Sequence, residues 1–177
     1  NFSIIWQRSS TKTEWQAFPE TNGEVLQLSQ RHVGYSYRAV VSYEDGHGTK
    51  ELLVTSPSET VQNVDDPVQG EVLITGEATE GEVILVSTTG VSDEDGIASM
   101  SVGWEASTDG RNWRAIETGG ATQLSLSQPL VNKQIRARVA VVDSFGVETV
   151  IFSQATNTVR NVNNKPAGTI FVRRVGG

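Results

Sequence analysis

The sequence contains no cysteine, only two histidines and no long apolar run. Without cysteine the chain can form neither disulfides nor thiolate metal sites. No stretch approaches the roughly 18 apolar residues of a membrane-spanning helix, so we expect no membrane span. The first residues, Asn1 to Ile5, do not have the pattern of a signal peptide, and any export signal is expected outside this sequence.

Basic residues are also scarce, with 14 Lys and Arg against 21 Asp and Glu and a net charge of −7. Nucleic-acid binding needs a concentrated Lys/Arg face, so this composition argues against a nucleic-acid partner. It fits an acidic surface or a protein that binds cations.

An internal repeat organises the chain. The segment Asn63 to Ile74, NVDDPVQGEVLI, returns as NVNNKPAGTIFV at Asn161 to Val172, an offset of 98 positions that also separates Trp6 from Trp104. Identical residues at this offset are Trp15 and Trp113, Leu26 and Leu124, Leu28 and Leu126, Arg38 and Arg136, Ala39 and Ala137, Asp45 and Asp143, and Gly48 and Gly146. Such a register indicates a tandem array.

The register predicts three parts. Residues 1–66 form an incomplete repeat that lacks its first strands, residues 67–165 form a complete repeat, and residues 166–177 form the first strand of a further repeat. A unit of about 100 residues can bury a core of its own.

Short alternating runs bounded by turn residues predict the strands of the complete repeat. Asp109-Gly110 is a hairpin signal, and Ile135 to Val141 alternates between apolar and mostly polar residues, as in a strand with one face on a core. Trp104 and Trp113 are interpreted as core and sheet-edge residues rather than a sugar-binding platform. About seven strands with a Trp in the third predict an all-β fold of tandem immunoglobulin-like β-sandwich domains, one complete and one incomplete, plus a terminal strand.

The chain resembles the Ig-like or cadherin-like repeats of giant bacterial surface adhesins, including those of the RTX type. The resemblance rests on Gly76, Ala78, Glu80 and Gly81, on the loop Asp93 to Gly96, on the Trp-containing strand and on the Asn-Val joints. It departs from the pattern at Val131-Asn132, where Val-Gly is usual, and at Asn163-Asn164, where an Asp is usual. The resemblance implies extension or adhesion at the cell surface, in a biofilm or a filament, without catalysis.

Two acidic clusters are candidate Ca²⁺ sites. They are Asp65 and Asp66 in the joint, and Asp93, Glu94 and Asp95 in a loop. Hard oxygen ligands close together suit calcium, although the spacing is not that of an EF-hand. Short Asp-Gly loops are also common as solvated turns, so both interpretations stay open.

The sequence gives no support for an enzyme. His32 and His47 lie in the incomplete repeat, where the second repeat has Leu130 and Phe145, and no nucleophile motif accompanies them. The Gly-Gly pair within Glu117 to Thr122 does not join a strand to a helix, as a phosphate loop would.

Two functions remain. The first is a structural or extender module of a cell-surface adhesin or extracellular fibre, whose partners are neighbouring repeats or identical chains. Assembly by strand exchange would use the terminal residues Thr169, Ile170, Phe171 and Val172 to fill the incomplete repeat. Alternatively, the missing strands belong to a longer parent chain, or an insertion separates the two halves of a split domain.

The second function is a module that binds a glycan or protein ligand through the loops at Lys12 to Glu14 and Pro19 to Gly23, which differ between the repeats.

Overall fold

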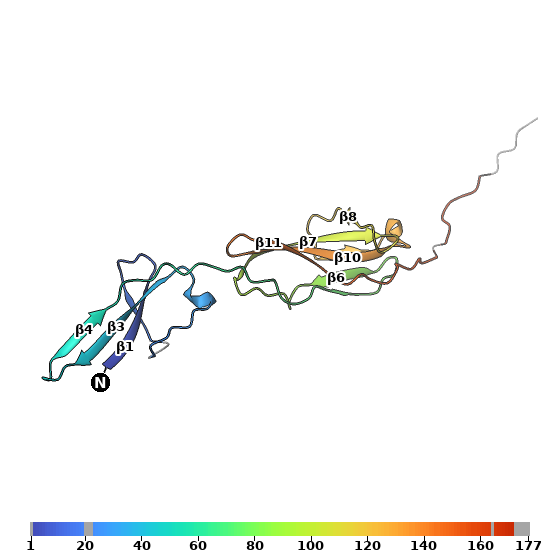
Figure 1. The fold of residues 1–177 in the computed structure, drawn as a ribbon. Helices are drawn as coiled ribbons and strands as arrows, with labels where there is room; N and C mark the ends of the chain where they lie inside the picture. The colour runs from blue at the N-terminus through green and yellow to red at the C-terminus, as the bar shows by residue number, and fades with distance from the viewer. Residues whose placement is uncertain (1, 20–22, 164, 172–177) are drawn as a thin grey trace, which may run out of the picture. The chain divides into compact units, whose positions relative to one another are not determined.

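The structure is a computed structural model that describes residues 2–19, 23–163 and 165–171. The chain divides into two compact units, Asn1–Asp66 (unit 1) and Pro67–Gly177 (unit 2), drawn in Figure 1. Both are built from antiparallel strands, which confirms the all-β prediction. The only helical elements among the described residues are two 3-10 turns, η1 (Gln30–His32) and η2 (Gln128–Leu130).

Unit 1 is one four-stranded sheet. Its order is β2-β1-β3-β4, with β1 spanning Phe2–Ser9, β2 Gln16–Phe18, β3 Ser36–Glu44 and β4 Lys50–Val54. The central strands β1 and β3 pair over their full length, with Trp6 opposite Ala39.

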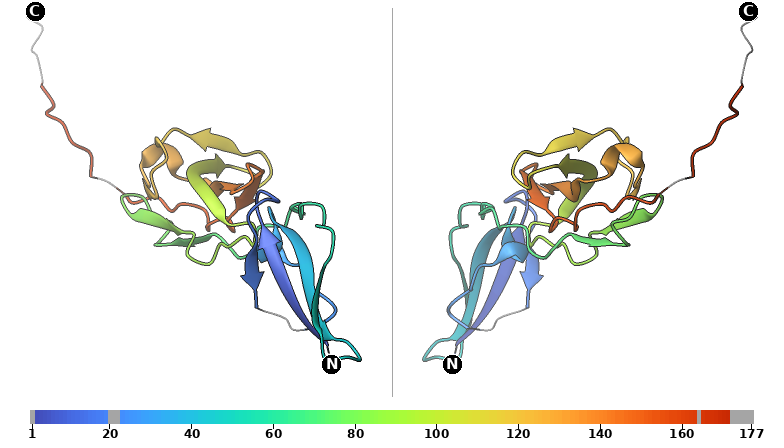
Figure 2. Two further views of the ribbon diagram at one scale, coloured as in Figure 1. Left: turned by 90° about the vertical axis from the view of Figure 1, so that its left-hand side faces the viewer. Right: turned by 90° about the vertical axis from the view of Figure 1, so that its right-hand side faces the viewer.

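Unit 2 is a sandwich of two sheets, visible as two layers in Figure 2. The larger sheet has the order β11-β10-β7-β8, where β7 is Ile97–Ser107, β8 Arg114–Ile116, β10 Gln134–Asp143 and β11 Glu148–Phe152. The smaller sheet has the order β5-β6-β9, where β5 is Leu73–Thr75, β6 Val83–Ser87 and β9 Gln123–Ser125. Apolar residues between these sheets form the core of the unit.

The predicted alternation in β10 is confirmed. Ile135, Ala137 and Val139 are fully buried, Val141 is nearly so, and the arginines between them lie on the other face. Trp104 in β7 is 1% exposed and faces the same core. Burial of one face of each sheet fixes the register, because a slip by one residue would turn this apolar set toward water.

Side-chain contacts repeat at the same offset as the sequence. The indole N–H of Trp6 donates to the carbonyl of Gly23 at 3.0 Å, and that of Trp104 donates to the carbonyl of Ala121 at 2.8 Å. Outside the core, the guanidinium groups of Arg38 and Arg136 each lie 4.3 Å from the ring centre of the matching tryptophan, Trp15 and Trp113. The two units are therefore built on one design.

The departure at Val131-Asn132 keeps the backbone conformation of the other repeat. Asn132 has φ 64°, close to the 82° of its counterpart Gly34. Each donates its backbone N–H to the carbonyl of a matching valine, Asn132 to Val159 and Gly34 to Val61. Asn tolerates the left-handed region better than most residues, so it can replace glycine in this turn.

The described residues of unit 1 contain strand counterparts of β7, β8, β10 and β11 but not of β5, β6 and β9. In unit 2 the core includes Ile84 of β6 and Val72, the residue before β5. The described residues of unit 1 carry no second sheet over the matching face. Leu28 is 50% exposed there, whereas its counterpart Leu126 is 0% exposed.

The segment after the second joint forms no strand in its described part. Thr169, Ile170 and Phe171 belong to no strand, and Ile170 is 92% exposed. A strand needs a neighbouring edge to pair with, and the described residues contain none paired with this segment, so the first strand of a further repeat stays a prediction. Val172, also assigned to strand exchange, lies outside the described residues.

The hairpin after β7 gives a prediction for acid stability. The Asp109 carboxylate accepts hydrogen bonds from the backbone N–H groups of Asn112 and Arg111, the Asn112 side-chain amide and the Ser107 hydroxyl. These bonds lower the pKa of Asp109 well below its usual value, the Asn112 backbone contributing most. Because the folded pKa is depressed, the stabilisation is present above the unfolded value of 3.8 and is lost as pH falls.

We therefore expect Asp109→Asn to flatten the fall in unfolding free energy as the pH drops below about 5. Urea denaturation of the wild type and the variant from pH 7 to pH 2 measures this slope. Identical slopes in the two proteins would contradict the role assigned to the Asp109 carboxylate.

Candidate metal site

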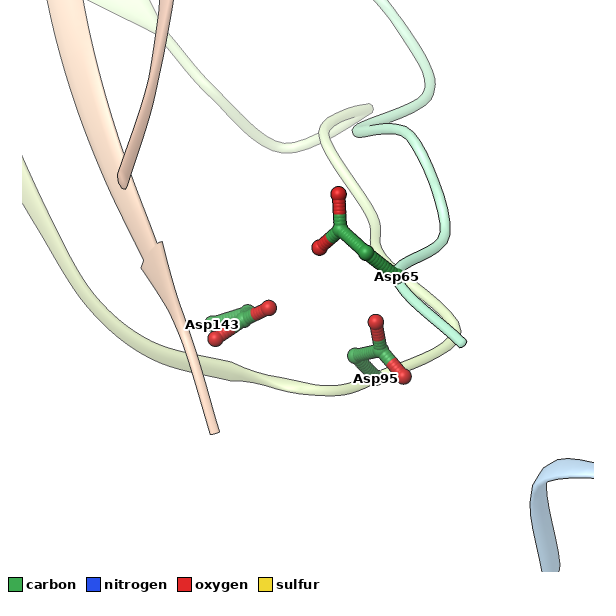
Figure 3. A group of neighbouring side chains, drawn as sticks. All are labelled: Asp65, Asp95 and Asp143. Atoms are coloured by element: carbon green, nitrogen blue, oxygen red, sulfur yellow. The ribbon is translucent and has the colours of Figure 1, made fainter. Parts of the chain in front are cut away.

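Three aspartates come together in the structure (Figure 3). One carboxylate oxygen from each of Asp65, Asp95 and Asp143 lies within 4.8 Å of the others. Asp65 belongs to the joint, Asn63 to Pro67, Asp95 to the loop before β7, and Asp143 is the last residue of β10. We call this group the acidic triad.

The loop before β7 holds Asp95 in place. The backbone N–H of Asp95 donates to the Asp93 carboxylate at 2.8 Å, and that of Gly96 donates to the Asp93 carbonyl at 3.1 Å. Gly96 has φ 80°, and a Cβ at this position would lie 2.8 Å from the Ser144 hydroxyl oxygen. The turn therefore requires glycine, and it buries Asp95.

Asp143 uses one oxygen for structure and leaves the other available. Its Oδ1 accepts the backbone N–H groups of Phe145 and Val147, both at 2.8 Å, and so closes the turn between β10 and β11. Its Oδ2 is buried and has no hydrogen-bond partner among the described residues, although the residue is only 3% exposed. Burying an unpaired carboxylate oxygen is costly, so this atom indicates a ligand.

The electrostatics of the triad also favour a bound cation. Two like charges 4.8 Å apart repel by roughly 3 kcal/mol at an effective dielectric constant of about 20. Asp95 and Asp143 are both buried, so solvent screens their charges less than it would on the surface. A metal ion among the three carboxylates would turn this repulsion into attraction, and the acidic triad could hold one.

The structure brings together two of the five predicted ligands, Asp65 and Asp95. Asp93 acts in the turn that positions Asp95, while Asp66 and Glu94 lie outside the triad. Asp143 was missed as a ligand by the sequence analysis. The sequence feature that marks Asp143 is its match to Asp45 at the repeat offset. This match was interpreted as part of the repeat and not as evidence for a metal ligand.

The equivalent turn in unit 1 contains Asp45, the counterpart of Asp143, without the other two aspartates of the triad. Asp45 accepts the backbone N–H groups of His47 and Thr49, both at 2.8 Å, and thus repeats the two turn bonds of Asp143. These bonds lower the pKa of Asp45, the bond from Thr49 contributing most. Asp45 belongs to no group of three metal-ligand side chains among the described residues.

The two histidines have separate surroundings. His32 is fully buried, with its ring 5.3 Å from that of Phe18 and 5.4 Å from that of Tyr37, and its Nδ1 accepts the Ser29 backbone N–H. His47 lies exposed in the turn closed by Asp45.

No protein-family model and no curated protein matches the chain. Among the residues that the structure describes, no helix has the length and apolar character needed to cross a membrane.

Proposed function

We propose that this chain is a structural extender module of a bacterial cell-surface adhesin or extracellular fibre, located outside the cell, and that Ca²⁺ binds its acidic triad. The observation that carries the proposal is the 98-residue repeat, whose joint contributes Asp65 to the triad. Tandem units that bury separate cores are suited to spanning distance rather than to chemistry.

Calcium is favoured by the ligand set. The triad offers only carboxylate oxygens, which are the ligands of hard cations, and calcium takes about six to eight oxygens in flexible geometry. Backbone carbonyls and water would complete its coordination. Magnesium demands a tighter octahedral arrangement and keeps more of its water.

A bound cation would tie the joint to the loops of unit 2. Asp65 lies two residues before Pro67, Asp95 belongs to the loop before β7, and Asp143 is the last residue of β10. Binding would therefore stabilise unit 2 and restrict the joint. Asn163 at the corresponding position of the second joint offers a neutral carbonyl, so we expect a weaker site there.

Calcium should raise the melting temperature of unit 2. Binding to the folded state alone adds about 2.7 kcal/mol at a free concentration 100 times the Kd, or roughly 10 °C for a domain of about 100 residues. Calorimetry with calcium and with chelator measures the shift, and proteinase K digestion of the joint Asn63 to Pro67 should slow when calcium is present.

The matched variants are Asp143→Asn and Asp45→Asn. Both weaken the same pair of turn bonds, but only Asp143 belongs to the triad. We expect Asp143→Asn to abolish the calcium response and Asp45→Asn to keep it. Equal melting curves with calcium and chelator in the wild type would refute calcium binding and leave the solvated-turn interpretation.

One observation favours ligand binding as a second function. Lys12 has φ 61°, a strained conformation for a residue with a side chain, whereas its counterpart in unit 2 is Gly110 with φ 69°. Strain of this kind often occurs at binding sites, and Lys12 lies in one of the loops that differ between the units. A glycan array probed with the intact chain distinguishes a binding module from an extender.

A further inference from the structure

The joint Asn63 to Pro67 is held at its start by the 3-10 turn η1. The side-chain amide N–H of Gln30 donates to the side-chain oxygen of Asn63 at 2.9 Å, and both residues are half-buried. The backbone N–H of Gly34, just after the turn, donates to the Val61 carbonyl at 2.9 Å. The turn therefore holds the chain that leaves unit 1 at two points, and we call the Gln30–Asn63 bond the joint clamp.

The turn itself has a fixed position in unit 1. The backbone N–H of His32 donates to the Ser29 carbonyl at 2.9 Å, and that of Val33 donates to the Gln30 carbonyl at 3.1 Å. The His32 ring is fully buried, with its edge against the ring of Phe18. Packing thus holds the turn in place, and the side chain of Gln30 reaches the joint from a fixed support.

Unit 2 repeats this arrangement at the offset of 98 positions. The side-chain amide of Gln128 donates to the side-chain oxygen of Asn161 at 3.2 Å, and the backbone N–H of Asn132 donates to the Val159 carbonyl at 3.0 Å. Leu130 anchors the matching turn, η2, in the core. The same donor, acceptor and spacing in both units indicate that the clamp belongs to the design of the joint.

The joint clamp lies close to one ligand of the acidic triad. Asn63 precedes Asp65 by two residues, whereas Val61 precedes it by four. One residue spans at most about 3.6 Å, so the Cα atom of Asp65 can lie about 7 Å from that of Asn63 but about 14 Å from that of Val61. Halving this reach reduces the volume open to Asp65 by up to about eightfold.

We propose that Gln30 is a positioning residue for the acidic triad, because the joint clamp holds Asp65 beside the other two carboxylates before a cation binds. This inference rests on the proposed calcium site. A cation that meets an ordered joint does not have to offset the conformational entropy of ordering it, and so binds more tightly. Gln30 supplies no ligand itself and acts through Asn63 on the position of Asp65.

The test measures the calcium affinity of the full chain by isothermal titration with CaCl₂. Gln30→Leu removes the donor of the joint clamp, while Gln128→Leu removes the equivalent donor in unit 2 and leaves the joint Asn63 to Pro67 unchanged. We expect the Kd to rise about three- to eightfold for Gln30→Leu and to stay the same for Gln128→Leu. In chelator, Gln30→Leu should speed proteinase K cleavage of the joint by a similar factor, because cleavage follows the population of the open joint.

Two further variants separate positioning from a general loss of stability. Gln30→Asn combined with Asn63→Gln keeps the summed length of the two side chains and can form the bond again, so it should restore the wild-type Kd. Asn63→Ala removes the acceptor and leaves the residues of η1 unchanged. It should reproduce the weaker affinity, which tests the inference even if Gln30→Leu perturbs unit 1.

Three results would overturn the inference while leaving the calcium site in place. One is a wild-type Kd in both Gln30→Leu and Asn63→Ala. Another is an equal rise in Kd for Gln128→Leu, and the last is a double exchange that binds calcium as weakly as Gln30→Leu. A wild type that binds no calcium refutes the proposed site and this inference together, so failure of the site is seen in the wild type and failure of the inference alone is seen in the variants.

Discussion

Trp104→Ala is expected to destabilise unit 2 by about 3 to 5 kcal/mol, a large fraction of the stability of a small domain. Trp104 lies in the central strand β7, opposite Ala137 of β10 and Ile116 of β8. The substitution leaves a large cavity between the sheets and removes the donor to the Ala121 carbonyl. The expected result is therefore unfolding of unit 2 rather than loss of a binding surface.

Denaturation followed by far-UV circular dichroism measures the effect without relying on the lost fluorophore. Trp113→Ala is the control, because Trp113 is only partly buried and packs beneath the Arg136 guanidinium at the sheet surface. We expect the control to lose much less stability. If Trp104→Ala melted at the wild-type temperature, the placement of Trp104 in the core would be wrong.

Local patterns predicted much of the fold of unit 2. The alternation in Ile135 to Val141 fixed the inward face of β10, and Asp109-Gly110 marked the hairpin between β7 and β8. Both signals depend on neighbouring residues, whose period and turn chemistry can be read directly. The repeat offset also identified the strands for which unit 1 has no counterpart.

The alternation of residues along a strand predicted the face on which a side chain lies but not how deeply that side chain is buried. Met100 has the same parity as Trp104 in β7, yet Met100 is 39% exposed. It pairs with Val141 near the end of β10, and Val141 is 1% exposed. How deeply a side chain is buried depends on the residues that the facing sheet places opposite it. The periodicity of a single strand carries no information about those residues.

The acidic triad was harder to predict for the same reason. Asp65 and Asp95 were singled out because each has acidic neighbours in sequence, whereas Asp143 stands alone beside a turn. Its turn bonds explain its presence without a metal, as they do for Asp45. Only the folding of β10 beside the loop before β7 places its carboxylate near the other two.

Leu126→Ala and Leu28→Ala should differ sharply, although the two residues are equivalent in the repeat. Leu126 is fully buried, and its truncation should cost about 2 to 5 kcal/mol of the unfolding free energy of unit 2. Leu28 is half exposed, so its truncation removes little buried area and should cost about 0.5 kcal/mol in unit 1. The difference measures how much of the sandwich core unit 1 lacks.

The comparison uses dilute protein, so that contacts between copies do not cover Leu28. Chemical denaturation of each variant, with NMR signals assigned to each unit, gives the two losses separately. Equal losses would show that unit 1 buries Leu28 as fully as unit 2 buries Leu126, and would contradict the exposure of Leu28 in the structure.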